Sequence, residues 1–335
     1  MHRPFPPRSW LTLLACWLCA VLLAAPALAA KAAASTATAT ATAADPCPEW
    51  LPYLPNVKPA LCAAARLQPT VGRSVKGRTL FARDVAAPEV GLRVLVVGGM
   101  HGDELSSASL AMHWIQWASQ TPSNAHWRFI PALNPDGLLA KPAQRMNANG
   151  VDLNRNFPTP NWARDAKLYW EQRTRKDPRR WPGPKPLSEP ESRYLHDEMQ
   201  RFQPHLIVSI HAPYGLLDFD GPGTPPPKLG RLYLDQVGIY PGSLGNYGGI
   251  HKGMPVVTIE LPSAYRTPQE AEIRQMWLDL LRWMSAHIPT PPRSLQPPPL
   301  SHQPRHARRP GPEPGMISQT GVVTEKFDEQ IAVCA

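Results

Sequence analysis

The chain has 335 residues, of which 43% are hydrophobic, so it is long enough to bury a sizeable core in one large domain or two small ones. Its formal net charge of +9 would suit an anionic partner such as nucleic acid, a membrane surface or an acidic polymer. The basic residues gather in one stretch and near the end of the chain, and no recognised nucleic-acid module accompanies them. The charge therefore favours a solvated basic face over a nucleic-acid site.

The N-terminal segment is typical of a secretory signal peptide. It has the three expected parts: Arg3 and Arg8, an apolar run from Trp10 to Leu23, and the small-residue cleavage site Ala27-Leu28-Ala29. We expect residues 1–29 to be removed, leaving a periplasmic or secreted protein that begins near Ala30 and has no stable membrane span. An uncleaved anchor is the alternative, because the apolar run approaches the lower length limit for a spanning helix. Pro26 and the cleavage site favour removal.

The cysteines that would remain after cleavage are Cys47, Cys62 and Cys334. In an oxidising compartment Cys47 and Cys62 are close enough in sequence to form a disulfide, which would cross-link the N-terminal segment of the domain. Cys334 lies in the tail, so the sequence offers it no obvious partner.

Composition divides the rest of the chain into three segments. Residues 30–46 include a Thr-Ala alternation and are predicted to be a low-complexity linker. Residues 47–288 carry the apolar patterns of a folded domain. From residue 289 to residue 335 the chain is rich in proline, which predicts an extended, disordered tail.

Inside the folded domain, short β-branched runs alternate with longer helical patterns. This alternation predicts an α/β fold, in which helices cover a parallel or mixed sheet on both faces. Four strands are expected: 93–97, 127–131, 205–210 and 256–259. Three helices are expected: one from about residue 104 to 117, one after Ser188 with Glu191 as capping-box partner, and one opening on the capping box Thr267-Pro268-Gln269-Glu270.

Polar side chains lie where the predicted strands end. His101 follows the first strand, His211 ends the third and Glu260 ends the fourth, while Asn134-Pro135-Asp136-Gly137 follows the second. In open α/β sheets, ligands bind in the crevice beyond the carboxyl ends of the strands. These residues are therefore predicted to converge on one pocket.

Two histidines and one carboxylate form a candidate metal site. His101 and Glu104 make a His-x-x-Glu motif at a strand-to-helix turn, which is weak evidence alone because the spacing often occurs by chance. A distant histidine, His211, completes the ligand set of a catalytic zinc, with a fourth position left for water. The alternative for His211 is a hydrogen-bonded core histidine.

Glu260 is the candidate general base. A carboxylate at the end of the apolar run 256–259 is unusual for a plain strand end, and beside a metal it could take a proton from the activated water and pass it to the leaving amine. The alternative is a surface glutamate before a proline-containing loop.

These residues fall within motifs that resemble, in order, those of the M14-type zinc carboxypeptidases. The motifs are His101-Gly102-Asp103-Glu104, Asn134-Pro135-Asp136-Gly137, residues 151–158, Ser209-Ile210-His211 and Thr258-Ile259-Glu260-Leu261. The likeness covers roughly residues 72–283, and several separated motifs in order are far more specific than any one of them. It implies a zinc-carboxypeptidase-like fold with a mixed, twisted, eight-stranded sheet, and one Zn²⁺ per chain.

The resemblance also implies roles for five further residues. Asp152 would orient His101, Arg145 would stabilise the oxyanion, Asn154 and Arg155 would bind the substrate carboxylate, and Tyr240 would cover the pocket. Tyr247 is the alternative to Tyr240.

Within this family the likeness is greatest to the murein peptide amidases, because residues 145–150 lead directly into the Asp-Leu-Asn-Arg-Asn-Phe-Pro run and residues 241–245 precede the Glu260 strand. Those enzymes cut the amide bond between γ-D-glutamate and meso-diaminopimelate, which implies a murein-derived peptide as substrate. The alternatives are a metallocarboxypeptidase of other specificity, an N-deacylase similar to succinylglutamate desuccinylase, and an inactive murein-binding module. The basic segment 162–185 could contact an anionic wall polymer, or it could be a solvated loop.

Overall fold

The computed structural model describes residues 45–87, 91–121 and 123–289. The predicted signal peptide, most of the predicted linker and nearly all of the predicted tail lie outside these ranges. Within them, no helix combines the length and the apolar character that crossing a bilayer requires.

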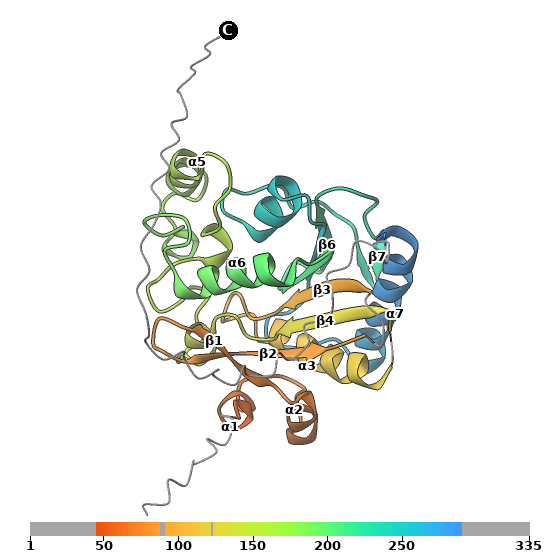
Figure 1. Cartoon of the computed structure of the whole chain (residues 1–335). Coiled ribbons are helices and arrows are strands. Elements are labelled where there is room, and N and C mark those ends of the chain that lie inside the picture. Colours follow the sequence, from red (N-terminus) through yellow and green to blue (C-terminus); the bar gives the residue numbers. More distant parts are fainter. Residues whose placement is uncertain (1–44, 88–90, 122, 290–335) are drawn as a thin grey trace, which may run out of the picture. The chain divides into compact units, whose positions relative to one another are not determined.

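The centre of the fold is a mixed sheet of seven strands in the order β1-β2-β4-β3-β5-β9-β6 (Figure 1). The strands are β1 Gln68–Arg73, β2 Thr79–Val85, β3 Leu92–Val97, β4 Ala125–Ile130, β5 Leu206–His211, β6 Leu216–Asp220 and β9 Val256–Glu260. The four central strands β4, β3, β5 and β9 are parallel, and β1, β2 and β6 join antiparallel at the edges. The four strands predicted from the sequence are these parallel ones, because only strands buried on both faces carry continuous apolar runs.

The expected count of eight strands was wrong for the described residues. Beyond β6, the chain forms the two-residue strands β7 Lys228–Leu229 and β8 Leu232–Tyr233, which pair with each other. Only one isolated bridge, between Leu217 and Leu234, connects this hairpin to β6. A segment this short forms too few ladder hydrogen bonds to extend the sheet.

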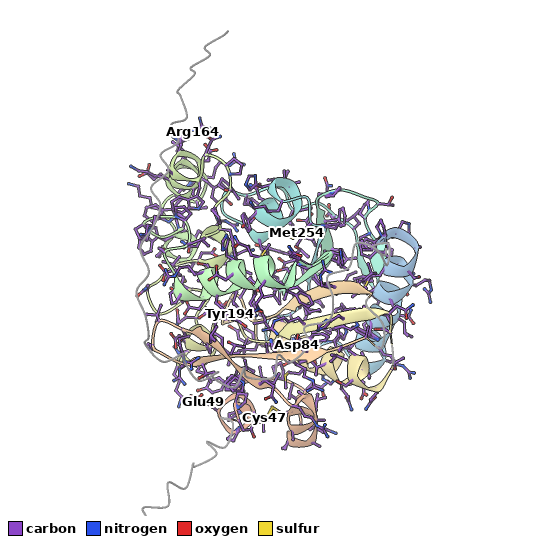
Figure 2. All side chains as sticks on the ribbon, in the orientation of Figure 1. Cys47, Glu49, Asp84, Arg164, Tyr194 and Met254 are labelled. Atoms are coloured by element: carbon purple, nitrogen blue, oxygen red, sulfur yellow. A yellow bond between two sulfur atoms is a disulfide. The ribbon has the colours of Figure 1, made fainter. Side chains whose placement is uncertain are left out.

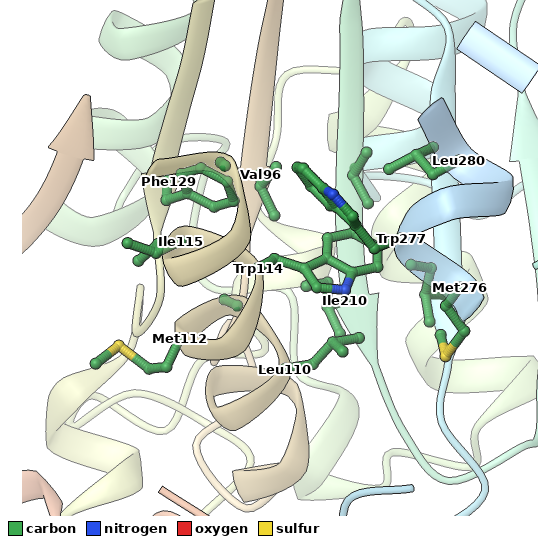
Figure 3. Packing of buried hydrophobic residues seen from close by; sticks show 14 of the residues in the cluster. Val96, Leu110, Met112, Trp114, Ile115, Phe129, Ile210, Met276, Trp277 and Leu280 are labelled. Carbon is green, nitrogen blue, oxygen red and sulfur yellow. The ribbon is translucent and has the colours of Figure 1, made fainter. Parts of the chain in front are cut away.

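Helices cover both faces of the sheet, as expected from the alternating pattern. On one face lie α3 Leu105–Gln120 and α7 Glu270–His287, with α1 Cys47–Trp50 and α2 Pro59–Ala65 in the same core cluster. Figure 3 shows Trp114 of α3 beside Trp277 of α7, with ring centroids 5.4 Å apart. On the other face, α6 Pro190–Phe202 and η4 Gly245–His251 pack against alternate residues of the same strands.

The remaining elements are short and lie in the connections. They are α4 Pro135–Leu138, η1 Leu153–Arg155, α5 Trp162–Leu168, η2 Tyr169–Arg173 and η3 Pro178–Arg180. Figure 2 labels Arg164 on α5 and Tyr194 on α6, the helix that precedes β5. The three η1–η3 turns and α5 belong to the segment that connects the β4 side of the sheet with α6.

The predicted Cys47–Cys62 disulfide is present and joins α1 to α2. Figure 2 shows Cys47 on α1, at the beginning of the described chain. The disulfide closes a separation of 15 residues, so α1 and α2 are held together although each has only one or two turns.

Both predicted capping boxes were wrong, although the helices themselves exist. Helix α7 begins at Glu270, with Gln269 as N-cap and no side-chain cap, because the chain up to Gln269 is extended. Helix α6 begins at Pro190, and the side chain of Glu191 instead accepts hydrogen bonds from Val75 N and Asn147 Nδ2. Long-range hydrogen bonds use the carboxylate that the local motif assigned to the cap.

Candidate active site

The order of the strands brings the predicted site residues to one edge of the sheet. Strands β3, β5 and β9 are immediate neighbours, and in the β5–β9 register His211 is directly paired with Glu260. His101 and Glu104 lie in the turn between β3 and α3. All four side chains are buried, and three of them, His101, Glu104 and Glu260, line a single cavity of about 750 Å³ beyond the strand ends, here called the site cavity.

His101, Glu104 and His211 place three donor atoms within 4.8 Å of one another. The Nδ1 atom of His211 lies 3.1 Å from Nδ1 of His101 and 3.0 Å from Oε2 of Glu104. The other carboxylate oxygen of Glu104 lies 2.8 Å from Nδ1 of His101. Two imidazole nitrogens and a carboxylate thus face the same point.

The outer nitrogens of both rings have their own partners. His101 Nε2 donates to Asp152 Oδ1 at 3.1 Å, and His211 Nε2 donates to Ser209 Oγ at 2.9 Å. With those protons in place, both Nδ1 atoms present lone pairs inward, which is the arrangement that a divalent cation needs. The donor set therefore fits a catalytic metal ion.

Arg145 and Asp152 form hydrogen bonds with the group His101, Glu104 and His211, here called the triad. Arg145 donates through Nε and Nη2 to Asp152 Oδ2, at 3.2 and 3.1 Å, and through Nη1 to Glu104 Oε1 at 3.3 Å. Burial alone would raise the pKa of Asp152, but the charges of Arg145 and His101 hold it well below the ordinary value. Asp152 is thus a permanent anion that fixes both His101 and Arg145.

The Asn134-Pro135-Asp136-Gly137 motif positions Arg145 and does not reach the triad. Asn134 Oδ1 accepts from Gly137 N, and its Nδ2 donates to the carbonyl of Arg145 at 3.1 Å. Gly102 also donates to that carbonyl, and a Cβ atom at Gly102 would lie 2.2 Å from the carbonyl carbon of Gly137. Glycine is required there because two stretches of backbone approach each other so closely.

Glu260 lines the cavity, and its carboxylate oxygen Oε2 is buried without a hydrogen-bond partner in the described part of the chain. Burial raises the pKa of Glu260 to about 8, and the nearby Glu104 carboxylate adds to the effect. A carboxyl group with a pKa near neutrality can both accept and return a proton.

Asn154, Arg155 and Tyr240 all line the cavity. Asn154 Oδ1 accepts from Leu244 N at 2.8 Å, so its amide N–H groups remain for a ligand. The guanidinium of Arg155 lies 4.6 Å from the ring centre of Tyr240 and 5.5 Å from that of Tyr169. Tyr247, the alternative to Tyr240, is buried in the core.

An acidic pair lines the cavity on the β6 side, and sequence reasoning did not find it. Asp218 and Asp220 are two residues apart on β6, so both point to the same face. Asp220 is only 8% exposed and makes no hydrogen bond or ion pair within the described ranges. Burial, with the charge of Asp218, raises its pKa to about 6. The only sequence signal was Asp-x-Asp alternation close after His211.

Comparison with known proteins agrees with this geometry. The sequence profile of the zinc carboxypeptidase family matches residues 64–219. Murein peptide amidase A of Escherichia coli (strain K12) is 33% identical over 224 residues, which cover 63% of this chain and 88% of that protein. The Vibrio campbellii protein of the same name is 33% identical over 208 residues, 60% of this chain and 82% of that protein.

The fold also matches a solved structure, the carboxypeptidase A of Helicoverpa armigera, with a TM-score of 0.52. The two chains are 17% identical, and the match covers 66% of this chain and 69% of the other, so it bears on the fold alone. The sequence matches show that the chain belongs to the M14 family of zinc carboxypeptidases and is a hydrolase of the metallopeptidase and amidase class.

Proposed function

We propose that this protein is a zinc-dependent amidase that cleaves the bond between γ-D-glutamate and meso-diaminopimelate in murein peptides. The observation that carries the proposal is the presence of opposite charges in one cavity, which both Arg155 and the Asp218–Asp220 pair line. Diaminopimelate carries both carboxylate and ammonium groups, so a leaving residue of this kind complements both charges. The relatives named murein peptide amidase A support the same substrate class.

His101, Glu104 and His211 would hold one zinc ion, with Asp152 orienting His101 and Ser209 orienting His211. A zinc ion held there supplies Lewis acidity to water and to the scissile carbonyl. The assignment follows from the two inward Nδ1 atoms and from the two-histidine, one-carboxylate donor set, which suits zinc in a catalytic site.

Glu260 would act as the general base. Its free Oε2 takes a proton from the attacking water while the water oxygen bonds to the carbonyl carbon of the γ-glutamyl group. The same carboxyl group then returns the proton to the amine nitrogen as the carbon–nitrogen bond breaks. The raised pKa of Glu260, about 8, suits a group that is both base and acid in one cycle.

Arg145 would stabilise the negative charge that develops on the carbonyl oxygen. Its guanidinium is held by Asp152 and Glu104 and still lines the cavity, so it is oriented before the substrate binds. Asn154 and Arg155 would bind the carboxylate of the leaving residue, and Tyr240 would cover it.

Turnover of L-Ala-γ-D-Glu-meso-diaminopimelate tests the proposal. We expect the metal-replete protein to release diaminopimelate, and chelator-treated protein or Glu260→Gln to release none at a comparable rate. If the native protein leaves this peptide intact, the substrate assignment is wrong.

A second candidate is a carboxypeptidase that removes C-terminal lysine or arginine, because the acidic pair also suits a basic side chain. A matched peptide ending in lysine separates the two, since lysine lacks the second carboxylate of diaminopimelate. Faster release of lysine than of diaminopimelate would favour this carboxypeptidase. Hydrolysis of N-succinylglutamate alone would favour the deacylase alternative.

We also propose that the protein is exported, with residues 1–29 removed and residues 47–288 forming the catalytic domain. The Cys47–Cys62 disulfide supports this, because disulfides persist in oxidising compartments. N-terminal sequencing of the protein from a periplasmic fraction should give a start near Ala30. Recovery of intact protein from the cytoplasm would contradict it.

A further inference from the structure

Residues 162–185, here called the basic insert, form a wall of the site cavity. The insert has eight lysine and arginine residues and three acidic ones. Five of its residues line the cavity: Tyr169, Thr174, Asp177, Arg179 and Arg180. The proposed reaction, as described above, does not use any of them.

Contacts with the site residues fix the insert in place. Tyr169 packs on the guanidinium of Arg155, and Arg179 Nη2 donates to Asp103 Oδ2 at 2.6 Å. Asp103 is buried and lies between the proposed metal ligands His101 and Glu104 in the sequence. The insert therefore reaches from the carboxylate-binding side of the cavity to the turn that carries two of the triad side chains.

The C-terminal part of the insert is fixed through its backbone. Asp152 N donates to the carbonyl of Trp181 at 2.8 Å, and Asn156 Nδ2 donates to the carbonyls of Pro182 and Lys185 at 2.8 and 3.0 Å. Both donors belong to the loop that holds the proposed substrate-binding residues. A solvated loop would have no such hydrogen bonds, so the position of this wall is part of the site.

Arg180 is the cation of the insert that is left for a ligand. It is half-buried, and its backbone N–H donates to the carbonyl of Asp177. Across the described ranges its guanidinium has no ion pair and no side-chain hydrogen bond, whereas the neighbouring Arg179 is paired with Asp103. A guanidinium lining a cavity without a partner is suited to a carboxylate, which it can bind through two parallel hydrogen bonds.

We propose that Arg180 binds the free α-carboxylate of the γ-linked D-glutamate, on the acyl side of the scissile bond. This inference rests on the proposed function. A glutamate linked through its side chain keeps its α-carboxylate, which lies only a short methylene chain from the scissile carbonyl, whereas a residue linked through its α-carboxyl has none there. Arg155 and the acidic pair serve the leaving residue, so Arg180 on the insert is the cation available to the acyl residue.

The test compares two substrates and three variants of the full chain. The substrates are L-Ala-γ-D-Glu-meso-diaminopimelate and its D-isoglutamine analogue, in which the α-carboxylate is an amide. The variants are Arg180→Gln, Arg180→Lys and Arg173→Gln. Arg173 is an exposed arginine of the same insert outside the cavity lining, so it is the matched control for loss of charge.

Arg180→Gln should lower kcat/KM for the carboxylate substrate about tenfold, mainly through KM, since a hydrogen bond to a charged group is lost. For the amide substrate, it should change kcat/KM by less than about twofold. Arg180→Lys should retain part of the preference, because it keeps the charge and loses the planar fork. Arg173→Gln should behave as the native protein on both substrates.

With these two substrates, the inference would be overturned by equal losses on both in Arg180→Gln, or by no preference for the carboxylate substrate in the native protein. A further peptide with lysine in place of diaminopimelate identifies the other possible target. If the effect of Arg180→Gln disappears with lysine and persists with isoglutamine, Arg180 binds the leaving residue and the inference is wrong. If the native protein cleaves none of these peptides, the proposed function itself fails, which is a distinct result.

Discussion

The two halves of the site cavity are built differently. The catalytic corner, which comprises His101, Glu104, His211 and Glu260, lies at the ends of central parallel strands, and all four side chains are less than 9% exposed. The basic insert consists of short helical turns, and Arg179, for example, keeps half of its side chain exposed. The corner is rigid and buried, while the insert is attached by individual contacts.

Under the proposed function, this difference would separate the chemical step from substrate selection. In the corner, the register of β5 with β9 sets the relative positions of His211 and Glu260, so the geometry depends on many ladder hydrogen bonds at once. In the insert, the long-range side-chain contacts at the cavity are few: Tyr169 packs on Arg155, and Arg179 pairs with Asp103. We therefore expect changes in the corner to affect kcat and metal content, and changes in the outer walls to affect KM and substrate preference.

The largest expected effect comes from Glu260→Gln. Without a group that takes and returns the proton, kcat should fall by about 10²- to 10⁴-fold. Zinc content, measured by elemental analysis of the purified protein, should stay at the native stoichiometry because Glu260 is not one of the triad side chains. A kcat within about tenfold of the native value would exclude Glu260 as the base.

Asp152→Asn should weaken zinc binding by about 10- to 100-fold, because the neutral asparagine no longer offers His101 a negatively charged hydrogen-bond acceptor. Competition with a chelator measures this change. The supporting contact is the 3.1 Å hydrogen bond from His101 Nε2. Asp84→Asn is the matched control, since Asp84 pairs with Arg128 on the sheet, away from the site cavity. Equal metal affinity in the two variants would mean that Asp152 has no such role.

Asp220→Asn should raise KM about tenfold for a leaving residue with a side-chain ammonium group and leave an alanine-terminated peptide unaffected. Because the pKa of Asp220 is about 6, ammonium binding by the native protein should be lost as pH falls through about 6. The variant should lack this pH dependence. A KM change that is the same for both peptides would point to a general structural effect.

The same substitution should stabilise the protein. The pKa of Asp220 is raised above its ordinary value of 3.8, so between pH 3.8 and about 6 the folded state binds more protons than the unfolded chain. Stability contributed by this group therefore falls as pH rises through that window. At neutral pH the variant's free energy of unfolding should be higher by about 1 kcal/mol after allowance for solvent screening. It should therefore unfold at a higher temperature. A lower melting temperature would contradict the assignment of Asp220 as an unpartnered buried acid.

Tyr169→Ala should give the smallest effect, a rise in KM of about two- to fivefold with kcat unchanged, because one cation–π contact to Arg155 is removed. Tyr169→Phe keeps the ring and should match the native protein. If kcat falls instead, the insert contributes to the chemical step, and the separation between corner and insert does not hold.

The elements predicted well from the sequence are those with strong local patterns. The four parallel strands are continuous apolar runs, and the polar residues that end or follow three of them, His101, His211 and Glu260, come together at the site. Edge strand β6 escaped prediction because it is short and alternates apolar residues with Asp218 and Asp220. The caps of α6 and α7 were mispredicted because tertiary hydrogen bonds and backbone conformation overrode a local motif.

The sequence by itself determined which predicted strands are followed by polar residues. It also determined the cysteine pair and the motifs that identify the family, because all of these depend on residue type and spacing. Only the tertiary structure decided which side chains complete the site. The pair Arg179–Asp103, the place of the acidic pair of β6 in the cavity and the choice of Tyr240 over Tyr247 for the cavity all depend on where the chain returns in space. Residues 103 and 179 are 76 positions apart, and no local pattern encodes a contact over that distance.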